Sequence, residues 1–121
     1  MNIPAAQARM TFPVKVQIAL DEKSGYLTVT PSHLILNSVL KNEIQVTCLL
    51  EKAAQIEIAF DPKDTPFRNY RFLLKGNSKV LSGVPRPEKT RETPYKCTVR
   101  VLNADPKSPA NVPVACTVMI N

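Results

Sequence analysis

The chain has 121 residues, of which 44% are hydrophobic, and a formal net charge of +6. That length suits a single domain with its own core, and no apolar run approaches the roughly 18 residues that a membrane helix needs. Eleven prolines stand against three glycines, which leaves too few glycines for a glycine-rich phosphate loop. Because proline is excluded from helix interiors, this composition favours strands joined by rigid loops.

Alternating apolar and polar residues, the period of a half-buried strand, recur along the chain. The first such segment, VKVQIAL at 14–20, follows an N-terminal arm that we assign to residues 1–13. YLTVT and, beyond Pro31, HLIL predict two short strands. EIQVTCLL at 43–50 and QIEIAF at 55–60 predict two longer ones.

The second half of the chain continues this organisation. YRFLL at 70–74 predicts a strand, and KGNSK predicts a turn with positive φ at Gly76 and Asn77. After the polar connection VLSGVPRPEKTRETP, the strands YKCTVRVL at 95–102 and VPVACTVMI at 112–120 close the chain. We therefore predict an all-β fold, a single-domain antiparallel Greek-key β-sandwich of about seven to eight strands spanning residues 14–121.

Three segments resemble the cupredoxin-like sandwich, namely GYLTVTPSHLIL, IEIAFDPKDTPF and the closing pair YKCTVRV and VPVACTVMIN. Tyr95, two residues before Cys97, is also placed like the tyrosine corner of immunoglobulin-like domains. The resemblance implies a sandwich of cupredoxin-like or immunoglobulin-like topology from Val14 onward. It does not imply the family's copper site, because blue copper takes two imidazoles and a thiolate and the chain has one histidine, His33.

Three roles are open to Cys97: disulfide partner, metal ligand or core thiol. A structural zinc site is not expected, because zinc takes four Cys or His ligands at short spacings and this chain has no C-x₂-C pair. We interpret Cys48, Cys97 and Cys116 as small buried residues, the usual environment of free cysteine. The alternative pairs Cys48 with Cys97, which resembles the inter-sheet disulfide of immunoglobulin domains, although a reducing compartment disfavours it.

The excess positive charge lies in the second half of the chain. Residues 61–121 carry eleven basic and five acidic side chains, whereas residues 1–60 carry five of each. In the strand at 95–102, Lys96 and Arg100 share one face, opposite Cys97. We predict a basic interaction surface in this half. Its candidate residues are Arg68, Arg71, Lys75, Arg86, Lys89, Arg91, Lys96 and Arg100.

No catalytic constellation is visible, because Ser-His-Asp and Cys-His sites need a histidine beside the nucleophile and His33 follows a Pro-Ser pair at a strand start. We expect no enzyme, metal or cofactor, but a non-catalytic protein-interaction or structural accessory subunit that binds a protein partner or itself. The alternative is nucleic-acid or polyanion binding through the basic half. The N-terminus lacks the apolar core of a secretory signal, so we expect a cytoplasmic protein. We also expect no small-molecule substrate.

Overall fold

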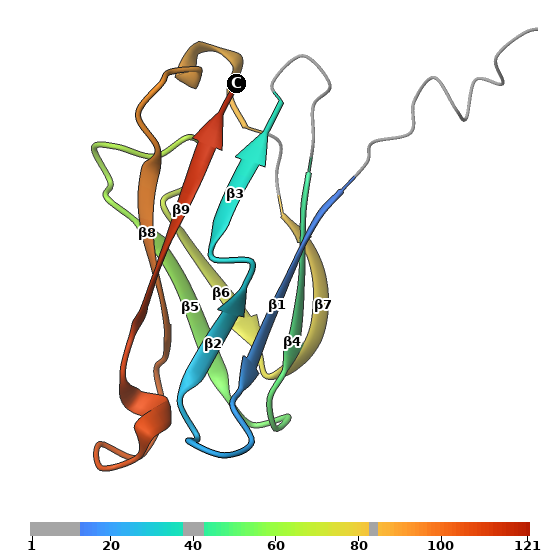
Figure 1. Cartoon of the computed structure of the whole chain (residues 1–121), viewed down its shortest axis with the longest axis vertical. Coiled ribbons are helices and arrows are strands. Elements are labelled where there is room, and N and C mark those ends of the chain that lie inside the picture. The colour runs from blue at the N-terminus through green and yellow to red at the C-terminus, as the bar shows by residue number, and fades with distance from the viewer. Residues whose placement is uncertain (1–12, 38–42, 83–84) are drawn as a thin grey trace, which may run out of the picture.

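Two β-sheets make up the fold in the computed structural model, which describes residues 13–37, 43–82 and 85–121 (Figure 1). The four-stranded sheet has the order β2-β1-β4-β7, and the five-stranded sheet has the order β3-β9-β8-β5-β6. Within the described ranges the strands are β1 (Val14–Leu20), β2 (Leu27–Thr30), β3 (His33–Leu36), β4 (Ile44–Leu49), β5 (Gln55–Phe60), β6 (Arg71–Lys75), β7 (Asn77–Ser82), β8 (Tyr95–Val101) and β9 (Val114–Ile120). The assigned N-terminal arm falls, but for Pro13, outside these ranges.

The prediction of an all-β sandwich is confirmed, but the prediction that it is antiparallel throughout is wrong. β1 pairs with β4 in parallel, and β3 pairs with β9 in parallel, so both sheets are mixed. The strand count was also too low, because β7 lies where the sequence predicts a turn and a polar connection. The segment NSKVLS shows no clear alternation, and its strand conformation comes from antiparallel pairing with β4.

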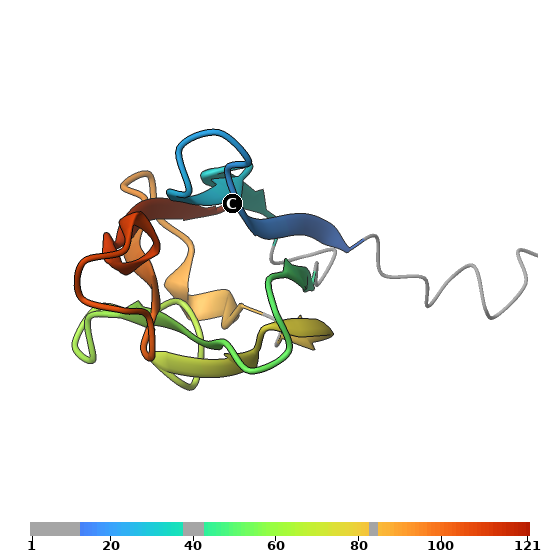
Figure 2. The same cartoon turned by 90° about the horizontal axis from the view of Figure 1, so that it is seen from below.

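The chain passes from one sheet to the other at both sides of the sandwich. β2 pairs with β1 and β3 pairs with β9, and the cis Thr30–Pro31 peptide bond lies between them. On the opposite side, β6 leads through Gly76 into β7 of the other sheet. Figure 2, which looks along the strands, shows the two sheets facing one another across the core.

The core lies between the two sheets and is built from the inward face of each strand. β8 shows the pattern most clearly, because Cys97 and Val99 are buried while Lys96 and Arg100 are exposed, as the sequence predicts. The largest fully buried aliphatic side chains include Ile18 of the four-stranded sheet. Burial of such a side chain contributes about 2 kcal/mol to the free energy of unfolding. Because the apolar residues alternate, this burial determines which face of each strand remains exposed and available to partners.

All three cysteines are buried, as the sequence predicts, but only Cys48 is free. Cys97 and Cys116 lie directly opposite each other on β8 and β9, 5.2 Å apart at Cα, and form a disulfide. Cys48 lies on β4 in the other sheet and is free and buried; burial raises the pKa of its thiol. The proposed Cys48–Cys97 pair is therefore wrong, because the partner of Cys97 is the cysteine on its neighbouring strand.

Gly76 occupies a tight position between the sheets. Its N–H donates to the Ala54 carbonyl at 2.8 Å, and its carbonyl accepts from the Leu50 N–H at 3.1 Å. A Cβ at Gly76 would lie 1.8 Å from the Glu51 carbonyl oxygen. Among the described residues only Gly25 is a glycine with positive φ, so the positive φ predicted at Gly76 is wrong; space, not φ, requires glycine there.

Candidate functional site

The structure divides the predicted basic residues between two regions. Four of them lie on β6 and β8, where strand alternation directs their side chains to the outer face of the five-stranded sheet. These four are Arg71, Lys75, Lys96 and Arg100. The others lie in loops, with Arg68 between β5 and β6, and Arg86, Lys89 and Arg91 between β7 and β8. The eight residues therefore come from two strands and two loops.

Glu57 lies at the centre of the basic sheet face. Its side chain is only 4% exposed, although it belongs to the outward row of β5. Arg71 donates from Nε to one carboxylate oxygen, and Arg100 donates from Nε to the other at 2.9 Å. The hydrogen bond from Arg71, together with Arg100, holds the pKa of Glu57 below its ordinary value, against the opposing effect of burial. Glu57 thus neutralises part of the positive charge on this face.

Replacing Glu57 with glutamine is expected to lower the free energy of unfolding at neutral pH by about 1–2 kcal/mol, because two charge-assisted hydrogen bonds are lost and their arginine partners are half exposed. Because the folded-state pKa of Glu57 is lowered, its contribution is present above the unfolded-state pKa and is lost as pH falls through the folded-state pKa. Denaturant titrations at pH 7 and pH 3 should show a smaller difference between Glu57→Gln and wild type at pH 3. A difference that is independent of pH would contradict this.

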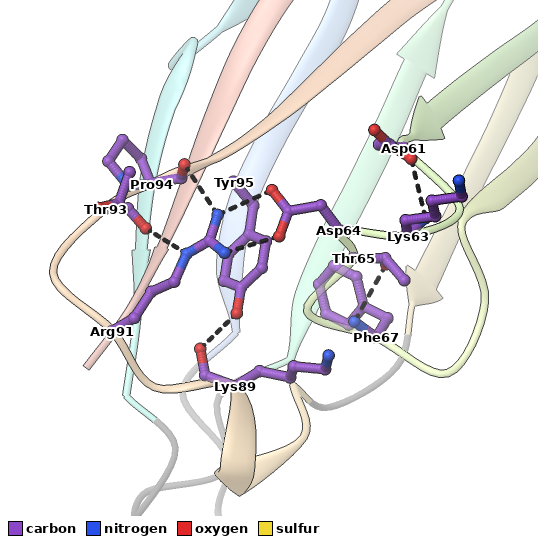
Figure 3. A network of polar contacts seen from close by, with 10 residues as sticks. All are labelled: Asp61, Lys63, Asp64, Thr65, Phe67, Lys89, Arg91, Thr93, Pro94 and Tyr95. Atoms are coloured by element: carbon purple, nitrogen blue, oxygen red, sulfur yellow. Dashed lines mark hydrogen bonds and ion pairs between the residues drawn. The ribbon is translucent and has the colours of Figure 1, made fainter.

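Arg91 connects the loop before β8 to the loop after β5 (Figure 3). Its Nη1 and Nη2 donate to the two carboxylate oxygens of Asp64 at 2.6 and 2.9 Å, and its Nε donates to the Thr93 carbonyl at 2.8 Å. Nη2 also reaches the Pro94 carbonyl at 3.4 Å. Arg91 therefore holds two loops together through its hydrogen bonds within the chain.

The Tyr95 ring packs against the guanidinium of Arg91. The ring centroid of Tyr95 lies 3.6 Å from Cζ of Arg91, and its hydroxyl donates to the Lys89 carbonyl at 2.7 Å. A tyrosine whose hydroxyl bonds to backbone a few residues upstream has the geometry of a tyrosine corner. The Arg91–Asp64 pair lowers the pKa of Asp64 and raises that of Arg91. Both effects reflect mutual stabilisation of the charged forms.

The other predicted basic residues differ in how their charges are balanced. Arg86 forms an ion pair with Glu88 at 2.6 Å, with both side chains about half exposed. Within the part of the chain that the structure describes, four candidates have no ion pair within bonding distance. These are Arg68, Lys75, Lys89 and Lys96. Acidic side chains therefore pair with the other four candidates, Arg71, Arg86, Arg91 and Arg100.

The outer edge of β6 is a feature that sequence reasoning missed. β6 ends the five-stranded sheet, and no described strand pairs with its second side. The Phe60 N–H donates to the Tyr70 carbonyl directly opposite it, so by antiparallel alternation Phe72 and Leu74 also bond to β5. The N–H and C=O groups of Arg71 and Leu73 therefore point away from β5. Within the described ranges, the backbone donors and acceptors of these two residues have no partner strand.

An apolar cavity of about 400 Å³ lies behind this edge, between the two sheets. Side chains from both sheets line it, and so do Arg71, Phe72, Leu73 and Leu74 of β6. Arg71 and Leu73 face outward whereas Phe72 and Leu74 face inward, so a cavity that touches all four reaches the edge of the strand. Protein cores hold few voids larger than a water molecule, and a space of this size is within the range of ligand pockets.

Three phenylalanines shape one wall of the cavity. Phe60, Phe67 and Phe72 pack edge to face in pairs, with ring centroids 5.6, 6.5 and 5.8 Å apart. Phe67 belongs to the loop that Asp64 and Arg91 hold in place, and its N–H donates to the hydroxyl of Thr65. The loop anchor shown in Figure 3 therefore fixes the position of a cavity-lining ring.

The β6 edge offers backbone hydrogen-bonding groups, and the cavity behind it is lined mostly by apolar side chains. Among the residues that the structure describes, no group of three His, Cys, Asp or Glu side chains is placed to hold a metal ion. Over the same ranges, no helix has the length and apolar character required to cross a membrane. No model of a known protein family matches the chain, and no significant relative is found among curated proteins.

Proposed function

We propose that the protein is a non-catalytic interaction module, or a structural accessory subunit, that binds an extended segment of a protein partner along β6. The observation that carries this proposal is the unpaired edge of β6 over an apolar cavity. Strand addition takes its affinity from backbone hydrogen bonds and its specificity from pockets for alternate side chains. A free backbone edge and an apolar pocket both occur at β6. Leu73, which is 60% exposed, adds apolar contact on the outer side.

Selection of displayed random peptides against the purified protein tests this proposal. Enriched peptides should alternate apolar and polar residues, the period of an added strand. They should bind wild type and Leu73→Ala, which keeps the free amide of residue 73, and lose binding to Leu73→Pro, which removes it without breaking a hydrogen bond to β5. Circular dichroism of both variants checks folding. Equal binding of the selected peptides to folded Leu73→Pro would remove the proposal.

A second candidate function, polyanion or nucleic-acid binding, has one observation in its favour. Lys75 and Lys96 lie on the same sheet face as Arg71 and Arg100. Against it, Glu57 neutralises part of that face. None of the described outward-facing residues of β5, β6 and β8 is aromatic, whereas single-strand binders stack bases on aromatic side chains. Retention on an oligonucleotide column that falls steeply with salt, and falls further in a Lys75→Glu and Lys96→Glu variant, would favour this function.

A further inference from the structure

Residues 6–12, AQARMTF, have the alternating pattern of a strand with one apolar face. The apolar positions are Ala6, Ala8, Met10 and Phe12, and the polar ones are Gln7, Arg9 and Thr11. We propose that residues 6–12 of one copy add to the free edge of β6 in a second copy, and that Met10 and Phe12 enter the apolar cavity. This inference rests on the proposed function, since it names the partner strand as a segment of the same chain.

The size and lining of the cavity fit these side chains. In another protein, free benzene, which matches the ring of a phenylalanine side chain such as Phe12, binds in an engineered apolar cavity of about 150 Å³. The cavity here measures about 400 Å³, which leaves room for Met10, whose flexible thioether fills irregular apolar space. Phe60, Phe67 and Phe72 supply the aromatic wall against which both side chains would pack.

The outward row of β6 sets the register that we propose for the added strand. β6 and β7 are joined at Gly76 and belong to different sheets, and no described strand pairs across the seam between them (Figure 1). With residues 6–12 antiparallel to β6, Thr11 would lie opposite Arg71 and Arg9 opposite Leu73. The methylene stem of Arg9 then covers the exposed Leu73 side chain.

The position of the pattern along the chain favours a second copy over the chain's own β6. β1 begins at Val14 and is separated from β6 by β4 and β7. With strands about 4.8 Å apart, the crossing from β1 to the seam spans about 15 Å, or about five residues at about 3.3 Å each. Within one chain, residues 8–12 would be used for that crossing, whereas a second copy can offer the whole alternating segment.

This mode of binding is head to tail. The donor segment and the acceptor edge are different surfaces of the chain, so each copy can donate to one neighbour and accept from another. Such heterologous contacts build open chains unless the rotation closes a ring. We therefore expect assemblies that grow with protein concentration.

Sedimentation velocity of the full chain over a range of concentrations tests the inference. Wild type should show a mass that rises with concentration. Met10→Asp places a charge on the inserted face and should be monomeric, while the control Thr11→Asp, which changes the outward face, should still assemble. Leu73→Pro should also be monomeric. A mixture of Met10→Asp and Leu73→Pro should form 1:1 dimers that do not grow, because one sound donor segment and one sound edge remain.

Each other outcome decides against the inference in a distinct way. Wild type that stays monomeric at every concentration overturns it, as does Met10→Asp that assembles like wild type or a mixture that forms no dimer. If assembly survives Met10→Asp but is lost in Leu73→Pro, the added strand is not residues 6–12, and strand addition to β6 stands. If selected peptides bind Leu73→Pro as well as wild type, the proposed function itself fails.

Discussion

Replacing Gly76 with alanine is expected to lower the free energy of unfolding by about 3 kcal/mol or more, the upper range for overfilling a packed site. The added Cβ would lie 1.8 Å from the Glu51 carbonyl oxygen and 2.9 Å from Cβ of Ala54. The nearest obstacle is backbone, which cannot move aside as a flexible side chain can. Relief would require breaking the bonds of Gly76 to Ala54 and Leu50, which join β6 and β7 to the turn after β4.

Gly25 provides the matched control, because glycine is required there for the opposite reason. Its φ is +76°, while a Cβ would meet only Pro109 at 3.6 Å. Alanine at Gly25 should cost about 1–2 kcal/mol from backbone strain, and asparagine should cost less, because asparagine tolerates the left-handed region. At Gly76, asparagine should be at least as harmful as alanine. Urea unfolding of the four variants checks this, and a Gly76→Ala protein as stable as wild type would contradict it.

The sequence predicts most of the fold because strand alternation is a local signal. The spacing of Cys97, Val99 and Val101 alone predicts which residues of β8 point into the core, and their burial confirms it. The parallel pairs and β7 could not be read in this way. They depend on which strands meet in space, and the polar segment NSKVLS becomes a strand through its partner β4.

The candidate site was harder to predict for the same reason. Charge in the sequence pointed to Arg91, but its carboxylate partner Asp64 lies 27 residues away and consumes its donors. No local signal marks β6 as an edge, because YRFLL has the composition of a buried strand. Leu73 is an apolar residue on the same face of the strand as Arg71 and Lys75, but a single exposed leucine is common on protein surfaces and does not by itself mark an edge.

Reduction of the Cys97–Cys116 disulfide is expected to lower the free energy of unfolding by about 3 kcal/mol, the value that loop-closure entropy gives for a loop of this length. The two cysteines are 19 residues apart in sequence, and the bond joins the adjacent strands β8 and β9. Guanidinium titrations with and without dithiothreitol measure the difference. Intact mass before and after reduction should differ by two hydrogen atoms per chain.

Two variants separate the effect of the bond from that of the third cysteine. Cys48→Ala removes the free thiol on β4 and keeps the disulfide, so it should lose stability on reduction by the same amount as wild type. A Cys97→Ala and Cys116→Ala double variant should be unaffected by reductant. If wild type proved insensitive to reductant while its mass showed three free thiols, the pairing would be wrong. Because β9 is bonded to both β3 and β8, loss of the disulfide should lower stability without opening the sheet, and the chain should remain folded at neutral pH.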